Sequence, residues 1–252
     1  MLKKLVYRLL CNNITGSVIY TFCKENVPDL RWPGFKFRIP QSSVNKEMTA
    51  SVFWGFYESS EIRFVEKYFR DDLDVIELGS SIGIVSSHIA SKLGSGRRLI
   101  TVEANPFLIE TINTNLQKHH NPASTFEVLN KAIGYDSEEV MITITNNNTE
   151  TRVVKSNLSG DTVAVKTIGL ADLIQKFDNK NYALVCDIEG SEVEMLMRET
   201  DALKKCSQLF IELHDTVYEN KQYNVQMLKD LIVKNHGFKI VDEHGPVVVF
   251  AK

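Results

Sequence analysis

One segment, Asp74–Ala90, limits the fold of this chain more than any other. It reads DVIELGSSIGIVSSHIA, in which a short apolar run leads through two glycines into a helix-like pattern. Gly79 and Gly83 permit a sharp turn and a close approach of the backbone to a ligand, because glycine carries no Cβ atom. A buried strand that enters a helix through such a turn is typical of α/β folds that bind nucleosides there. The segment therefore predicts a parallel α/β sheet with a nucleoside cleft.

The next apolar strand, Leu99–Glu103, ends in a carboxylate where such folds commonly bind ribose hydroxyls. The dinucleotide fingerprint G-x-G-x-x-G is absent, because Ser80, Ser81 and Ile82 separate the two glycines. Glu77 would also repel a pyrophosphate at the start of the helix. A carboxylate there suits a ligand that has cationic groups and no phosphate. S-adenosylmethionine, which carries an ammonium and a sulfonium, is such a ligand.

Five short motifs follow one another between residues 77 and 214. They are ELGSSIG at 77–83, VEANP at 102–106, NKAIG at 130–134, CDIEGSE at 186–192 and FIELH at 210–214. In this order they resemble the motifs of the FkbM family of S-adenosylmethionine-dependent methyltransferases. Cys186, Ser80 and Ser81 depart from the family pattern, and the two serines imply a more polar pocket floor. The resemblance implies the class I methyltransferase fold, a Rossmann-like, doubly wound, mostly parallel α/β sheet with an antiparallel C-terminal hairpin.

The expected cofactor-binding residues come from the glycine segment and from the motifs. They are Glu77, Gly79, Ser80, Gly83, Glu103, Ala104, Asn130, Ala132 and Asp187. Asn130 either binds the purine amine or closes a turn. Tyr57 and Glu58 occupy positions where the family has a tyrosine and a glutamate beside the cofactor. The alternative for these two is core packing by Tyr57 and helix capping by Glu58.

Candidate catalytic residues follow two further apolar strands, 183–187 and 209–213. They are Asp187, Glu212 and His214, at the end of the strands where open α/β sheets bind ligands. His214 suits a general base because the ordinary pKa of histidine lies near neutrality. The same three side chains suit a divalent metal ion, since several metals accept mixed carboxylate and imidazole ligands. The sequence leaves both roles open.

The chain length suits one domain, and we expect a methyltransferase domain over 61–252 after an N-terminal extension over 1–60. The extension, a helix with a short ribbon near 30–40, is expected to contact the substrate or a second subunit. Alternating residues at 140–145 and 162–168 indicate an antiparallel hairpin insertion over about 138–168, with its polar tip, 146–161, near the substrate. Further strands are expected at 126–133, 238–242 and 247–251. Helices are expected at 106–120, 169–177, 191–205 and 224–236, and within 53–69, where the helix is entered around residues 58–60.

Composition argues against some partners and compartments. The chain has 29 Lys and Arg against 32 Asp and Glu, without a basic block, which argues against a nucleic-acid substrate. The four cysteines form no C-x-x-C pair, so we expect reduced thiols in a cytoplasmic protein. No segment is long enough to span a bilayer.

The first ten residues predict a short amphipathic helix. Its apolar positions are Leu2, Leu5, Val6, Leu9 and Leu10, and its basic positions are Lys3, Lys4 and Arg8. No small-residue cleavage site follows, so a signal peptide is not indicated. Such a helix packs on its own domain, packs on a second subunit in a homo-oligomer, or lies on an anionic membrane as a peripheral anchor.

The expected function is that of an S-adenosylmethionine-dependent O-methyltransferase, in enzyme class EC 2.1.1. The resemblance suggests as acceptor a hydroxyl of a saccharide, a glycolipid or a secondary metabolite, with polysaccharide biosynthesis as the preferred setting. Two alternatives remain open. One is a nicotinamide-dependent oxidoreductase, and the other is a non-catalytic interaction module that binds S-adenosylmethionine and acts through the N-terminal helix.

Overall fold

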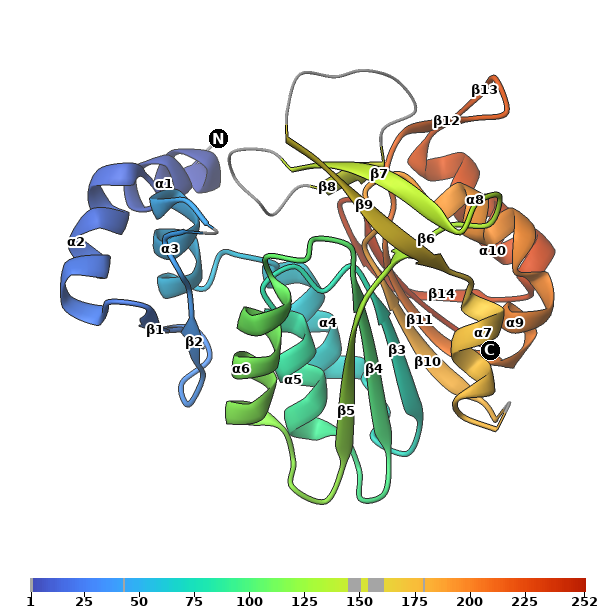
Figure 1. The fold of residues 1–252 in the computed structure, drawn as a ribbon, viewed down its shortest axis with the longest axis horizontal. Helices are drawn as coiled ribbons and strands as arrows, with labels where there is room; N and C mark the ends of the chain where they lie inside the picture. Colours follow the sequence, from blue (N-terminus) through green and yellow to red (C-terminus); the bar gives the residue numbers. More distant parts are fainter. Residues whose placement is uncertain (1, 43, 145–150, 154–160, 179) are drawn as a thin grey trace.

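Seven strands form the central sheet in the part of the chain that the structure describes, which is residues 2–42, 44–144, 151–153, 161–178 and 180–252. In this computed structural model the strand order is β14-β15-β11-β10-β3-β4-β5 (Figure 1). The strands are β3 (Asp74–Leu78), β4 (Arg98–Glu103), β5 (Thr125–Asn130), β10 (Tyr182–Cys186), β11 (Cys206–Glu212), β14 (Lys239–His244) and β15 (Val247–Ala251). Neighbours from β11 to β5 pair in parallel, while β15 pairs antiparallel with both β11 and β14. This arrangement confirms the expected class I methyltransferase fold with its C-terminal hairpin.

Helices cover both faces of the sheet, which explains why the central strands are apolar without a polar side. The helices are α4 (Ser59–Tyr68), α5 (Ile84–Lys92) and α6 (Ile109–His119) on one face, and α7 (Leu170–Gln175), α8 (Glu192–Arg198), α9 (Thr200–Lys205) and α10 (Val225–His236) on the other. Successive strand residues face opposite sides. Val75 and Val185 therefore pack under α4–α6, whereas Ile76 and Leu184 pack under α7–α10.

The N-terminal segment forms a separate group of elements beside α6 (Figure 1). It contains α1 (Leu2–Leu10), α2 (Asn13–Cys23), the antiparallel strands β1 (Asn26–Pro28) and β2 (Lys36–Arg38), and α3 (Lys46–Phe53). The buried amide of Asn115 in α6 connects it to the core. Asn115 Oδ1 accepts from the Arg38 amide at 2.6 Å, and its Nδ2 donates to the carbonyls of Arg38 at 3.1 Å and Ile82 at 2.9 Å. None of the described helices is both long and apolar enough to span a membrane.

A second sheet of the described residues lies above the first and has the order β6-β9-β7-β8. Its strands are β6 (Ala132–Ile133), β7 (Glu139–Ile144), β8 (Thr151–Val153) and β9 (Asp161–Ile168). The antiparallel pairing of β7 with β9 confirms the expected hairpin. Most of its expected polar tip, at 145–150 and 154–160, lies outside the described residues.

The helix expected to be entered around 58–60 does begin at Ser59, after Glu58 takes a left-handed φ of 45°. Three details of the expected elements are wrong. The strand expected over 126–133 divides at Lys131, because β6 leaves the central sheet to pair with β9. The helix expected over 191–205 divides at Glu199, whose carboxylate accepts from the Ala171 amide at 3.2 Å. A small hairpin, β12 (Thr216–Tyr218) with β13 (Lys221–Tyr223), was not expected at all.

Candidate active site

The glycine turn after β3 brings two strand ends together. Gly79, Ser81 and Gly83 all have left-handed φ angles, of 83°, 49° and 78°. A Cβ atom on Gly79 would lie 1.7 Å from the carbonyl oxygen of Asp187, at the end of β10. Only glycine therefore allows the turn and Asp187 to lie so close.

Glu103, the last residue of β4, holds this turn in place. Its buried carboxylate accepts hydrogen bonds from the amides of Ser81 and Asn105, each at 2.8 Å. Burial raises the pKa of Glu103 to about 7, although the backbone amides oppose that shift. Glu103 is thus a fixed acceptor at the wall of the cavity beside it.

A first cavity, of about 260 Å³, opens at the carboxyl ends of β3, β4 and β10. This is the edge where open α/β sheets bind ligands. Of the expected cofactor residues, it is lined by Gly79, Glu103, Ala104, Ala132 and Asp187. The structure therefore brings together more than half of the cofactor residues expected from the sequence.

The other four expected cofactor residues lie outside the first cavity. The carboxylate of Glu77 is buried behind it and accepts from Ser86 Oγ at 2.5 Å and Thr101 Oγ1 at 2.6 Å, and burial raises its pKa to about 7. Ser80 and Glu77 line a smaller cavity of about 20 Å³ on the far side of the turn. Gly83 begins α5.

The Asn130 side chain connects the end of β5 to the end of β4. Its Nδ2 donates to the carbonyl oxygens of Glu103 and Ala104, both at 2.9 Å. These bonds use the amide nitrogen, so the side chain holds the end of β4 in place. Its Oδ1 is the atom that suits a purine amine as hydrogen-bond acceptor.

Tyr57 and Glu58 complete the wall of the first cavity. The Tyr57 hydroxyl lies 2.8 Å from Ser81 Oγ, so this tyrosine contacts the glycine turn. Glu58 makes no side-chain capping bond to α4, which removes the structural alternative considered for it. Burial raises the pKa of both side chains well above their ordinary values.

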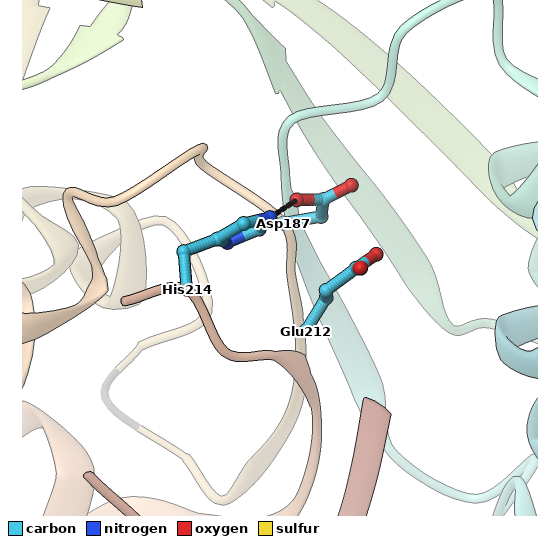
Figure 2. Close-up of side chains that lie close together, drawn as sticks. All are labelled: Asp187, Glu212 and His214. Atoms are coloured by element: carbon cyan, nitrogen blue, oxygen red, sulfur yellow. Dashed lines mark ion pairs between the residues drawn. The ribbon is translucent and has the colours of Figure 1, made fainter. Parts of the chain in front are cut away.

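Asp187, Glu212 and His214 meet beside this cavity, as expected from their strand ends (Figure 2). One ligand atom from each lies within 4.8 Å of the others. His214 Nε2 is 3.9 Å from Asp187 Oδ1 and 3.7 Å from Glu189 Oε2, while its Nδ1 is 3.1 Å from Glu192 Oε1. Glu189 and Glu192, which the sequence also places near the ends of these strands, are therefore two further members of this cluster.

The charges of this cluster perturb one another. Burial and the nearby carboxylates of Glu212 and Glu189 raise the pKa of Asp187 to about 8. The hydrogen bond to Glu192 raises the pKa of His214 to about 9. His214 thus holds a proton at neutral pH in this state, and the expectation based on its ordinary pKa does not apply to it.

A second cavity, of about 750 Å³, adjoins the first. Ile133, Glu189 and Ser191 line both cavities. Asp187 lines the first and His214 lines the second, so the titratable cluster lies between them. Two ligands bound side by side would meet at this cluster.

Comparisons with known proteins agree with this arrangement. The family model described as the methyltransferase FkbM domain matches residues 77–240. No curated protein matches the sequence.

Three solved structures illustrate the more distant similarities. A putative methyltransferase from Pseudomonas syringae is 11% identical, with 78% of this chain and 99% of that chain covered and a TM-score of 0.41. Aeropyrum pernix fibrillarin, solved with bound S-adenosyl-L-methionine, is 12% identical, with 76% and 73% covered and a TM-score of 0.40. Magnesium protoporphyrin IX methyltransferase from Synechocystis PCC 6803, solved with bound SAH, is 11% identical, with 77% and 80% covered and a TM-score of 0.43. Similarities this distant say nothing about the substrate of this chain. The family match, however, spans 164 of 252 residues, and the chain belongs to the FkbM methyltransferase domain family.

Proposed function

We propose that this chain transfers a methyl group from S-adenosylmethionine to a hydroxyl of a saccharide, a glycolipid or a secondary metabolite. The observation that carries the proposal is the pair of adjoining cavities with Asp187 and His214 at their junction. Methyl transfer is an in-line displacement, so an enzyme must hold donor and acceptor side by side in fixed geometry.

The first cavity suits a ligand with positive charge. Its lining includes the carboxyl groups of Glu58, Glu103, Asp187 and Glu189, against the single ammonium of Lys131 among the described lining residues. Asp187 Oδ1 is buried and has no hydrogen-bond donor within the described part of the chain. An ammonium group would donate the missing hydrogen bond, and a sulfonium would place a positive charge beside the carboxylate. Glu103 lies at the end of the second parallel strand, where its remaining lone pairs suit ribose hydroxyls.

The second cavity suits an uncharged or cationic acceptor. Its lining includes the carboxylates of Asp136, Glu139, Glu194 and Asp215, and no lysine or arginine among the residues that the structure describes. Carboxylates accept hydrogen bonds from sugar hydroxyls, and they repel phosphates and uronates. The same charge argues against a nucleic acid as acceptor.

S-adenosylmethionine supplies an electrophilic methyl group on a sulfonium. The residues of this chain then have to accept the proton of the acceptor hydroxyl. A positive charge beside Asp187 lowers the pKa of Asp187, and the carboxylate that forms offsets this charge at His214, 3.9 Å away. The neutral form of the imidazole is the proton acceptor for the hydroxyl. Glu192, through its 3.1 Å contact with Nδ1, fixes the orientation of the ring.

A divalent metal ion is the alternative role for the cluster. Asp187, Glu212 and His214 offer ligand atoms close enough to bind one ion together. Such an ion would acidify the acceptor hydroxyl in place of a base. Turnover that survives EDTA and does not rise with Mg²⁺ or Mn²⁺ supports the base, whereas turnover that depends on the ion supports the metal.

The decisive experiment combines binding with turnover. We expect calorimetry to detect binding of S-adenosylmethionine and not of NAD, and mass spectrometry to detect methyl ethers on neutral or amino methyl glycosides but not on glucuronides. His214→Asn should lower kcat by about 10²- to 10⁴-fold, while the control His120→Asn, at the end of α6, should not. Binding of NAD alone would support the oxidoreductase alternative, and cofactor binding without turnover on any acceptor would support the non-catalytic one.

A further inference from the structure

The outer side of α2 exposes a row of apolar side chains. Ile14, Val18 and Phe22 are 79%, 53% and 82% exposed, and their spacing puts all three on one side of the helix. The sequence contains no charged residue from Leu9 to Cys23. An exposed helix in a soluble protein normally has a charged outer side, so this surface differs from an ordinary one.

The neighbouring helix α1 also exposes apolar side chains. Leu5 and Leu9, one helical turn apart, are 55% and 65% exposed. We refer to Leu5, Leu9, Ile14, Val18 and Phe22 together as the N-terminal apolar face. Figure 1 shows α1 and α2 at the outer end of the molecule, with α3 between α2 and the central sheet.

Packing fixes α2 with this face outward. Its opposite side lies against α3, where Ile19 is buried. A Cβ atom on Gly16 would lie 1.8 Å from the carbonyl oxygen of Lys46, so the two helices are in backbone contact there. Rotation of α2 to bury Phe22 would break this contact.

The charge of this segment indicates what covers the face. Residues 1–24 contain four basic residues, Lys3, Lys4, Arg8 and Lys24, and no acidic residue. The rest of the chain has 25 basic residues against all 32 acidic ones. Basic residues beside exposed apolar ones are typical of helices that lie in the headgroup region of anionic membranes.

We propose that α1 and α2 dock this protein on an anionic lipid bilayer, with the N-terminal apolar face in the headgroup region. A second copy of the chain fits less well. In a symmetric dimer through this face each copy would present the same patch, which would bring two basic segments together, and residues 1–24 of neither copy supply a carboxylate. An anionic bilayer supplies both an apolar interior for the exposed apolar side chains and negative headgroups for the basic residues.

Helix α1 contacts the residue next to the wall of the first cavity. The Tyr7 ring of α1 packs edge to face on Phe56 at 5.7 Å between ring centroids. Phe56 directly precedes Tyr57, which lines that cavity. A lipid-linked sugar acceptor would therefore be held near the site. This link to the acceptor rests on the proposed function, whereas the docking itself does not.

Vesicle co-sedimentation of the full chain tests the proposal. We expect binding to vesicles of phosphatidylcholine with one fifth phosphatidylglycerol, and much weaker binding to phosphatidylcholine alone. Phe22→Ser should weaken binding on the order of tenfold or more. Arg8→Glu should weaken it at least about fivefold, since each basic residue near an anionic surface contributes about that factor. Ile240→Ser, an exposed apolar residue of β14, should bind as the unaltered chain does.

Two further measurements keep the outcomes separate. Calorimetry with S-adenosylmethionine on each variant reports whether the site is intact, so that loss of lipid binding with unchanged cofactor affinity supports docking. Light scattering reports the oligomeric state. Failure of the unaltered chain to bind anionic vesicles, or equal binding by Phe22→Ser, overturns the proposal. A dimer that Phe22→Ser dissociates, without vesicle binding, would identify a second copy as the occupant.

Discussion

Binding of S-adenosylmethionine is expected to release a proton from the cluster at the ends of β10 and β11. The pKa of Asp187 is raised to about 8 by burial and by Glu212 and Glu189. At pH 7 this carboxyl is therefore about nine-tenths protonated in the free protein. A ligand with net positive charge favours the ionised carboxylate, so the pKa falls toward its ordinary value. We expect Asp187 to release about 0.9 proton per ligand at pH 7 and about 0.5 at pH 8, and any release from Glu58 and Glu103, whose pKa values are also raised, adds to these numbers.

The same reasoning fixes the pH dependence of affinity. Protons and the cationic ligand compete for Asp187, so protonation at low pH weakens binding. Affinity should rise with pH, by up to about tenfold per unit, and level off above pH 8. S-adenosylhomocysteine, which lacks the sulfonium charge, should release fewer protons and show a flatter profile.

Calorimetry at pH 7 in phosphate and in Tris measures this release, because the two buffers differ in ionisation enthalpy. Asp187→Asn preserves the shape of the side chain but cannot titrate, so the release should fall by about 0.9 proton at pH 7. Asp201→Asn, on the exposed side of α9, is the matched control and should change nothing. Equal observed enthalpies in both buffers for the unaltered chain, or undiminished release in Asp187→Asn, would refute the electrostatic reasoning.

Three further predictions concern the glycine turn and the cluster. Glu103→Gln removes one of the acceptors for the Ser81 and Asn105 amides, so calorimetry should show cofactor affinity about 10- to 100-fold weaker. The control Glu127→Gln, on the neighbouring strand, should bind the cofactor normally. Equal affinities in the two variants would remove Glu103 from the ribose role. Gly79→Ala should lower the free energy of unfolding by at least about 2 kcal/mol, measured by chemical denaturation, because its Cβ would meet the Asp187 carbonyl at 1.7 Å. Gly245→Ala, whose Cβ meets no atom within 4 Å, should cost about 1 kcal/mol, and an equal loss at both positions would contradict the close contact. NMR titration should give His214 a pKa of about 9, and Glu192→Gln should lower this pKa. The pKa of His214 in the folded protein lies above the ordinary value of 6.5. The stabilisation of the fold by the His214–Glu192 pair is therefore full below pH 6.5 and is lost as the pH rises through 9.

The fold was predictable because its strongest signals are local. The run Val75–Leu78 is apolar except for Glu77 and leads into glycines, which identifies a central parallel strand and its turn from a few residues. The pairing of β6 with β9 had no such signal, because β6 is only two residues long, Ala132 and Ile133, and follows β5 after Lys131 alone. The hairpin of β12 and β13 turns at Glu219 and Asn220, both with left-handed φ, instead of at the glycine that such turns favour.

The sequence predicted those parts of the candidate site in which the end of a strand determines the position of a side chain. Asp187, Glu212 and His214 follow adjacent parallel strands, so their proximity follows from the sheet order. Their protonation did not follow from the sequence, since the pKa of His214 depends on Glu192 in α8. The burial of Glu77 behind the turn also depends on partners in other elements, Ser86 and Thr101.

The three hydrogen bonds of Asn115 have a practical consequence for anyone who shortens this protein. A chain that began at residue 61 would lose both bonds to Arg38, and the amide would keep only its bond to Ile82, inside the glycine turn. Such a fragment would expose the apolar side of α6 that β2 now covers. The glycine turn beside the first cavity would also lose part of the hydrogen bonding that holds it in place. The first sixty residues should therefore be retained when the protein is expressed, because they support the first cavity.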